Sequence, residues 1–81
     1  MFYVYLLRSK KDKKFYIGST SNLKLRFQEH NNGKVKSTSY RRPLRLVYYE
    51  AYINENVARK RERQLKSGKA NTALKKRLLE K

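Results

Sequence analysis

Three side chains that could bind phosphate and move protons lie close together in the stretch YIGSTSNLKLRFQEH. They are the phenol of Tyr16, the guanidinium of Arg26 and the imidazole of His30. Leu23, Phe27 and His30 recur at i, i+4 and i+7, the spacing of one helix face, and Arg26 lies between them on the same side. The sequence therefore predicts a helix that presents a guanidinium and an imidazole beside a phenol from the preceding strand.

Turn residues separate that strand from that helix. We expect the strand to run over 15–18 and to stop at Gly18, because residues 19–22 are all good turn and N-cap types. The helix is expected over 23–31, with Asn32-Gly33 as its left-handed stop. Gly18 at the junction would allow close approach of the backbone to a phosphate.

An aromatic and branched run over 2–7 predicts an earlier strand. Both of its faces are apolar, which is typical of a central strand covered on both sides. If the hairpin turns around Lys11-Asp12, Tyr5 faces Gly18. Tyr5 and Tyr16 then lie on one face as diagonal neighbours, a placement that a slip of one residue would abolish.

The second half of the chain adds one strand and two helices. Residues 34–43 read as a basic, hydroxyl-rich loop, which suits phosphate contacts and equally suits a solvated connector. Residues 44–51 predict a third strand. A helix follows it, and a further helix opens at Asn71 or Thr72.

The helix after the third strand carries a single carboxylate on its inner edge. Asn54 can cap this helix. Glu62 lies four residues after Ala58 and three before Leu65, so it sits on or beside the inward stripe. One interpretation is a salt bridge from Glu62 to Lys66, worth ~0.3–0.5 kcal/mol if exposed. The other is a metal ligand, because Mg²⁺ is often held by one or two carboxylates, with water and substrate phosphate completing its octahedron.

The other acids are weaker candidates for a metal ligand. Four of them lie in a lysine-rich turn, at a helix start, out of phase on the first helix, or at the terminus. They are Asp12, Glu55, Glu29 and Glu80. Glu50, which closes the third strand, is the one serious rival. The sequence therefore offers no carboxylate cluster for a two-metal site.

Charge points to a polyanionic partner. The 81 residues include 22 Lys and Arg against six Asp and Glu, a net charge of +16. Self-repulsion of that size destabilises a compact state in isolation, so nucleic acid is the expected partner. No apolar run is long enough to span a membrane, and the absence of cysteine excludes disulfides and thiolate metal sites. We expect one domain over 1–81, in a soluble cytoplasmic protein.

Basic side chains in two segments are the candidates for nucleic-acid contacts. One group lies on the loop and the other on the second helix. The residues are Lys34, Lys36, Arg41, Arg42, Arg59, Arg63 and Lys66.

The ordered set of tyrosine, tyrosine, arginine, histidine and glutamate resembles the GIY-YIG nuclease superfamily, most closely its small stand-alone members. The first half-motif is Tyr3-Val4-Tyr5, where the family has Gly-Ile-Tyr, and the second is intact as Tyr16-Ile17-Gly18. Arg26 and His30 fall on the next helix and Glu62 on a later one, as in the family. Tyr3 in place of glycine adds bulk beside the first strand but keeps the tyrosine that follows.

The resemblance implies an α+β fold, with a three-stranded antiparallel sheet flanked by about three helices in the order β-β-α-β-α-α. It also implies hydrolysis of DNA phosphodiester bonds with one divalent metal, Mg²⁺ or Mn²⁺, and no small-molecule cofactor. DNA is the expected substrate, RNA stays open, and a protein partner could supply specificity. The alternatives are a basic nucleic-acid-binding module that does not cut, and an accessory protein of an RNA-rich assembly.

Roles follow from the resemblance residue by residue. Glu62 would hold the metal, and Arg26 would bind the phosphate with a fork geometry that lysine lacks. Tyr5 would take a proton from the attacking water, with phenolate character favoured by nearby cations, and Tyr16 would position water or phosphate. His30 would accept the phenolic proton or orient the ring. The alternatives are ordinary strand aromatics for the tyrosines and a helix C-cap for His30.

Overall fold

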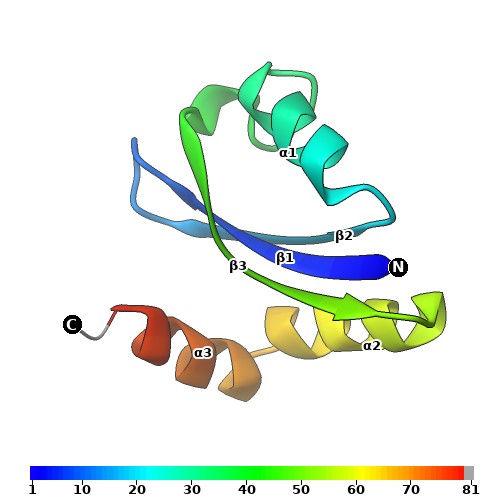
Figure 1. Ribbon diagram of the computed structural model, residues 1–81. Coiled ribbons are helices and arrows are strands. Elements are labelled where there is room, and N and C mark those ends of the chain that lie inside the picture. Colours follow the sequence, from blue (N-terminus) through cyan, green and yellow to red (C-terminus); the bar gives the residue numbers. More distant parts are fainter. Residues whose placement is uncertain (80–81) are drawn as a thin grey trace.

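A computed structural model describes residues 1–79 of the chain. Over these residues the strands and helices follow in the expected order β-β-α-β-α-α, with one short 3-10 turn (Figure 1). Their bounds are β1 Phe2–Ser9, β2 Phe15–Thr20, α1 Leu23–Asn31, β3 Leu44–Tyr52, α2 Glu55–Lys66 and α3 Lys69–Leu79, and the 3-10 turn η1 is Ser39–Arg41. The predicted α+β class is confirmed.

The strands of the described residues form one antiparallel sheet in the order β2-β1-β3. β1 is central, as its two apolar faces predicted, and its Val4, Leu6 and Leu7 are almost fully buried. The hairpin register is also as predicted, because Tyr5 pairs with Gly18 across the β1–β2 ladder. Both half-motifs therefore lie side by side at the β2 side of the sheet.

The helices cover opposite faces of the sheet. α1 lies over one face, while α2 and α3 lie along the other (Figure 1). On the α1 face, Tyr5, Leu7 and Leu44 form a small core with Phe27 packed against it. On the α2 face, a core of Val4, Leu6, Ile17, Ala58, Leu65 and Leu74 is larger. The sheet is thus a wall between two layers of side chains.

Local signals set the ends of the helices. The side chain of Asn22 accepts from the backbone N–H of Leu25 at the start of α1, and that of Asn54 accepts from two N–H groups at the start of α2. Gly33 has φ +77° just after α1, which is the left-handed conformation expected there.

Several predicted bounds were wrong. β2 does not stop at Gly18 but continues to Thr20, because Ser19 and Thr20 still pair with β1. β3 extends one residue further than predicted, and α3 begins at Lys69 instead of Asn71 or Thr72. In the predicted loop, the residues of η1 form a 3-10 turn. Glu80, one of the weaker candidates for a metal ligand, lies outside the described residues.

Glu50 holds α2 against the sheet. Its carboxylate accepts from Arg61 Nε at 2.9 Å and Nη2 at 3.1 Å, and from the hydroxyls of Tyr48 and Tyr52. Burial alone would raise its pKa, but these hydrogen bonds outweigh it and lower the pKa to about 2. The rival metal ligand is therefore committed to Arg61 and two phenols. No helix within residues 1–79 has the length and apolar character needed to cross a membrane.

Candidate active site

Tyr5 lies over a glycine of the neighbouring strand. Its side chain is only 2% exposed. A Cβ added to Gly18 would stand 2.6 Å from Tyr5 Cζ and still closer to its hydroxyl. Gly18 therefore makes room for the Tyr5 ring. A side chain at this residue would meet the phenol, and the close approach of the backbone to a phosphate stays a prediction.

His30 connects the Tyr5 phenol to a buried threonine. His30 Nε2 lies 2.9 Å from the Tyr5 hydroxyl, and its Nδ1 lies 2.8 Å from Thr38 Oγ1. The Thr38 hydroxyl donates to the carbonyl of Val35 at 3.4 Å. We therefore assign the proton to Nδ1, which donates to Thr38, and leave the Nε2 lone pair to accept from Tyr5. His30 and Thr38 are both fully buried.

Burial sets the pKa values of the two titratable groups in this hydrogen-bonded series, Tyr5 and His30. Desolvation raises the pKa of Tyr5 to about 12, although Arg26 acts in the opposite direction. Desolvation, with help from the charge of Arg26, lowers the pKa of His30 to about 4. The expectation of phenolate character at Tyr5 is therefore wrong for the protein by itself. Near neutral pH, Tyr5 is therefore a neutral phenol that donates to the neutral imidazole of His30.

Tyr16 completes an aromatic group around the imidazole. Its ring centroid lies 5.1 Å from that of His30 and 6.5 Å from that of Tyr5. It is less buried than Tyr5. The two half-motif tyrosines and the helix histidine predicted from sequence are thus brought together on one face.

Arg26 lies on α1 above the same face, with about 38% of its side chain exposed. Its Nη1 forms an ion pair with Glu29 Oε1 at 3.3 Å. Desolvation opposes the charged form of Arg26, but interactions with Tyr5 and Glu29 outweigh it and raise its pKa. Arg26 is therefore a permanent cation beside the Tyr5 hydroxyl, and it is exposed enough to meet a phosphate.

Glu62 reaches the site from the other side of the sheet. It lies on α2, and its Oε1 accepts from the Ser19 hydroxyl of β2 at 2.6 Å. Its Oε2 lies 2.8 Å from Lys66 Nζ, so the predicted salt bridge is present. Burial raises the pKa of Glu62, but Lys66 and Ser19 outweigh it, so the net shift is downward and the carboxylate is ionised.

The structure does not bring Glu62 into contact with the tyrosines. It places the carboxylate at the edge strand β2, on the α2 face, where it accepts from Ser19. Tyr5 nonetheless senses this charge, because Glu62 is among the groups that raise its pKa. A substrate lying across the β2 edge would therefore meet Arg26 and the tyrosines on one face and Glu62 on the other.

The residues at this edge fit a single divalent cation. Glu62 is ionised and about one fifth exposed, and one carboxylate with water and phosphate oxygens is a usual Mg²⁺ environment. Within residues 1–79 no three His, Asp or Glu side chains gather as a ready-made metal site. Glu62 is the residue that would hold the ion, and Lys66 would have to yield one carboxylate oxygen.

Two neighbours of the site were not among the predicted site residues. The sequence predicts a turn at Ser19, but the residue belongs to β2. The signal that could have found it is its alternation with Ile17, which places both on the α2 face of a longer strand. Thr38 lies in the loop, where its hydroxyl and the family resemblance both indicate a candidate site group without assigning it a role. Its burial beneath α1 results from tertiary packing.

Most of the predicted nucleic-acid contacts are exposed cations. Arg41 differs, because its side chain is 13% exposed and pairs with Asp12 at 3.0 Å. Arg42 lies against Gly33 and donates to the carbonyl of Ser39. The others stand on the surface of the loop and of α2, namely Lys34, Lys36, Arg59, Arg63 and Lys66.

Comparison with known proteins agrees with the fold and with the family that the sequence resembles. The family model of the GIY-YIG catalytic domain matches residues 1–77. The chain is 43% identical over 75 residues to a UPF0213 protein of Clostridium perfringens, covering 91% of this chain and 80% of that protein. It is 46% identical over 66 residues to a UPF0213 protein of Syntrophus aciditrophicus, covering 79% of this chain and 75% of that one.

A solved structure of a related protein has a similar fold. The solution NMR structure of a UPF0213 protein from Bacillus halodurans superposes with a TM-score of 0.57 at 32% identity, covering 93% of this chain and 81% of that chain. The chain belongs to the GIY-YIG family. Its relatives are UPF0213 proteins, small members of that family.

Proposed function

We propose that this protein is a divalent-metal-dependent endonuclease that hydrolyses phosphodiester bonds of DNA. The GIY-YIG family membership supports a nuclease fold. The observation that carries the proposal is the buried chain from Tyr5 through His30 to Thr38. DNA binding alone does not require a buried proton acceptor next to a phenol. Activation of the attacking water uses such an acceptor, because the proton that leaves the water must be taken up.

The proton would move along that chain as water attacks the phosphorus. Tyr5 oxygen would take a proton from the water while its own hydroxyl proton passes to His30 Nε2. This relay avoids a free phenolate, which a pKa of about 12 makes costly. The negative phosphate would favour the imidazolium that forms, reversing part of the effect that lowers the pKa of His30.

The remaining groups would bind and orient the substrate. The guanidinium of Arg26 would pair with the phosphate and meet the charge that grows in the transition state. Tyr16, which is less buried than Tyr5, would orient the water or a phosphate oxygen. When bound at Glu62, Mg²⁺ or Mn²⁺ would neutralise phosphate charge and stabilise the leaving oxygen.

The test is to compare wild type with Glu62→Gln on nicked, branched and single-stranded DNA, with and without Mg²⁺ or Mn²⁺. Glu55→Gln is the matched control, because it makes the same change on α2 at an exposed residue whose partner Arg59 lies at 3.8 Å. We expect cutting by wild type and by Glu55→Gln in metal only, and a loss of at least about a hundredfold in Glu62→Gln. Metal affinity, measured by calorimetry, should fall in the same variant.

The second candidate is a DNA-binding module on the same fold. The salt bridge between Glu62 and Lys66 supports it, because that pair already satisfies the carboxylate without a metal. Binding of every DNA form without cutting in any metal would select this candidate. Equal cutting by wild type and Glu62→Gln would place the metal elsewhere or reveal a contaminant.

A further inference from the structure

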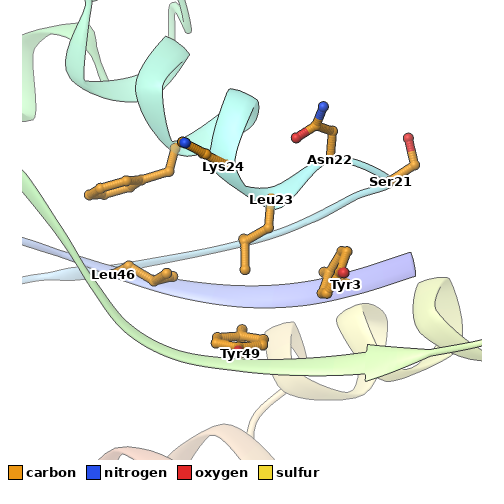
Figure 2. Close-up of a pocket in the computed structure, with 8 residues that line it drawn as sticks. Tyr3, Ser21, Asn22, Leu23, Lys24, Leu46 and Tyr49 are labelled. Carbon is orange, nitrogen blue, oxygen red and sulfur yellow. The ribbon is translucent and has the colours of Figure 1, made fainter. Parts of the chain in front are cut away.

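A hollow of about 500 Å³ opens between the first turns of α1 and the sheet. Figure 2 shows the rings of Tyr3 and Tyr49 at its sheet side and Leu23 pointing toward them from α1, while Ser21 and Asn22 point away. Phe27 and Leu46 also line it. The hollow is therefore apolar in its depth and polar only at its rim.

Two tyrosines give this hollow an aromatic floor. The centroids of Tyr3 and Tyr49 lie 6.1 Å apart with an interplanar angle of 65°, so the rings meet edge to face and are not stacked on each other. Tyr49 is 53% exposed, although it stands on the α1 face, where other aromatics are packed. Tyr3 is the residue that replaces the family's glycine, so part of this aromatic floor comes from the departure itself.

The hollow is adjacent to the candidate active site on the same face. Tyr3 lies two residues before Tyr5 on β1, so their side chains share a face about 7 Å apart along the strand. Tyr49 is the direct cross-strand partner of Tyr5. Phe27, which lines the hollow, follows Arg26 on α1. A strand whose phosphate meets Arg26 would therefore carry its next base to this hollow.

Charge selects the kind of ligand. Lys24 lines the hollow, and the whole chain carries +16. A flat apolar group attached to a polyanion matches both the aromatic floor and the basic rim. A nucleobase on a phosphodiester backbone has this chemistry, and aromatic side chains bind unpaired bases by stacking.

We propose that the hollow takes one unpaired base of a DNA strand, stacked on Tyr49 beside Tyr3, next to the nucleotide whose phosphate lies at Arg26. This inference rests on the proposed function for its ligand and adds the substrate class, a strand with an unpaired base. A base inside a duplex has both faces covered by its neighbours, so it must leave the stack to enter.

The experiment measures binding without metal, so that cutting plays no part. The probes are a short oligothymidylate and an abasic strand of the same length, which keeps the phosphates and removes the bases. The proteins are wild type, Tyr49→Ala and, as matched control, Tyr49→Phe, which keeps the ring. Because Tyr49 is half-exposed, thermal melting should show all three folded.

We expect wild type and Tyr49→Phe to bind the base-bearing strand roughly 5- to 150-fold more tightly than the abasic one, the range that one stacked base provides. Tyr49→Ala should lose this preference and keep its affinity for the abasic strand. Equal binding of both strands by wild type would overturn the base site and leave the nuclease proposal standing.

Two further outcomes would also overturn the base site. One is an unchanged preference in Tyr49→Ala. The other is a wild-type dimer without DNA that becomes a monomer in Tyr49→Ala, because the hollow would then seat a second copy. The nuclease proposal fails separately, if metal-loaded wild type cuts no DNA.

Discussion

At the scale of single residues, the site depends on one missing side chain and one buried imidazole. Gly18 leaves the space that the Tyr5 ring fills, and His30 lies behind the phenol with its other nitrogen held by Thr38. Neither arrangement leaves a free polar atom among the buried side chains of residues 1–79. A site built this way tolerates little change in volume or hydrogen bonding.

Gly18→Ala tests the space beneath the Tyr5 ring. The new Cβ would collide with the phenol, so the ring or the β2 strand must move. We expect a loss of about 1–3 kcal/mol in the free energy of unfolding, typical of overpacking, with a matching loss of cutting. The double variant with Tyr5→Leu should recover much of the stability in a double-mutant cycle. Additive losses would mean that the collision is relieved elsewhere.

His30→Gln tests the buried imidazole through the pH dependence of stability. Burial lowers the pKa of His30 from 6.5 to about 4, so between these pH values the unfolded state binds one more proton than the folded state. Wild type should therefore lose up to about 3 kcal/mol of unfolding free energy as the pH falls through this window. Urea unfolding of the variant should lack this component. Parallel curves for the two proteins would contradict it.

At the scale of elements, the site depends on how α1 and α2 are fixed to opposite faces of one sheet. α1 is set by its Asn22 cap and by its packing on the Tyr5 and Leu7 face. α2 is set by its Asn54 cap, by Ala58 and Leu65 in the core, and by Arg61. Glu62 can reach the β2 edge only while α2 keeps this position.

Arg61→Gln tests the attachment of α2 to β3. The change leaves the Glu50 carboxylate, only 16% exposed, without its bidentate cation. We expect about 1–3 kcal/mol of lost stability, less than for a fully buried pair because Arg61 is 30% exposed. The Glu50→Gln and Arg61→Gln double variant should recover part of the loss in urea unfolding. Arg59→Gln, at an exposed pair on the same helix, is the control and should change stability by less than about 0.5 kcal/mol.

At the scale of the whole molecule, charge governs how the protein meets its substrate. The small fold carries +16, and the predicted phosphate contacts stand on the loop before β3 and on α2. A positive field raises the rate of encounter with nucleic acid. Without nucleic acid, the repulsion among the same charges lowers the stability of the folded protein.

DNA affinity should therefore fall steeply with salt. If about six phosphates are neutralised, raising salt from about 50 to about 200 mM should weaken binding by roughly a thousandfold. Lys34→Gln should reduce the slope of log K against log salt by about one. Fluorescence anisotropy at several salt concentrations measures both, with Tyr49→Phe as a control of unchanged slope. A flat salt dependence would argue against phosphate contacts.

The sequence by itself determined the local structure and the list of candidate groups. Aromatic and branched runs predicted the strands, Asn22 and Asn54 predicted the helix starts, and the opposition of Tyr5 to Gly18 followed from the hairpin turn. These features depend on neighbours close in the chain, which is why they could be read from it. The domain over 1–81 and the roles of the site residues stay predictions.

Only the tertiary structure decided what each group touches and how it ionises. Glu62 lies across the sheet edge from the tyrosines, held by Ser19, because α1 and α2 pack on opposite faces. Tyr5 is a neutral phenol and not a phenolate, because burial outweighs the nearby cation. Contact and burial depend on residues far apart in the chain. The spacing of residues along the sequence therefore does not indicate which side chains are shielded from solvent.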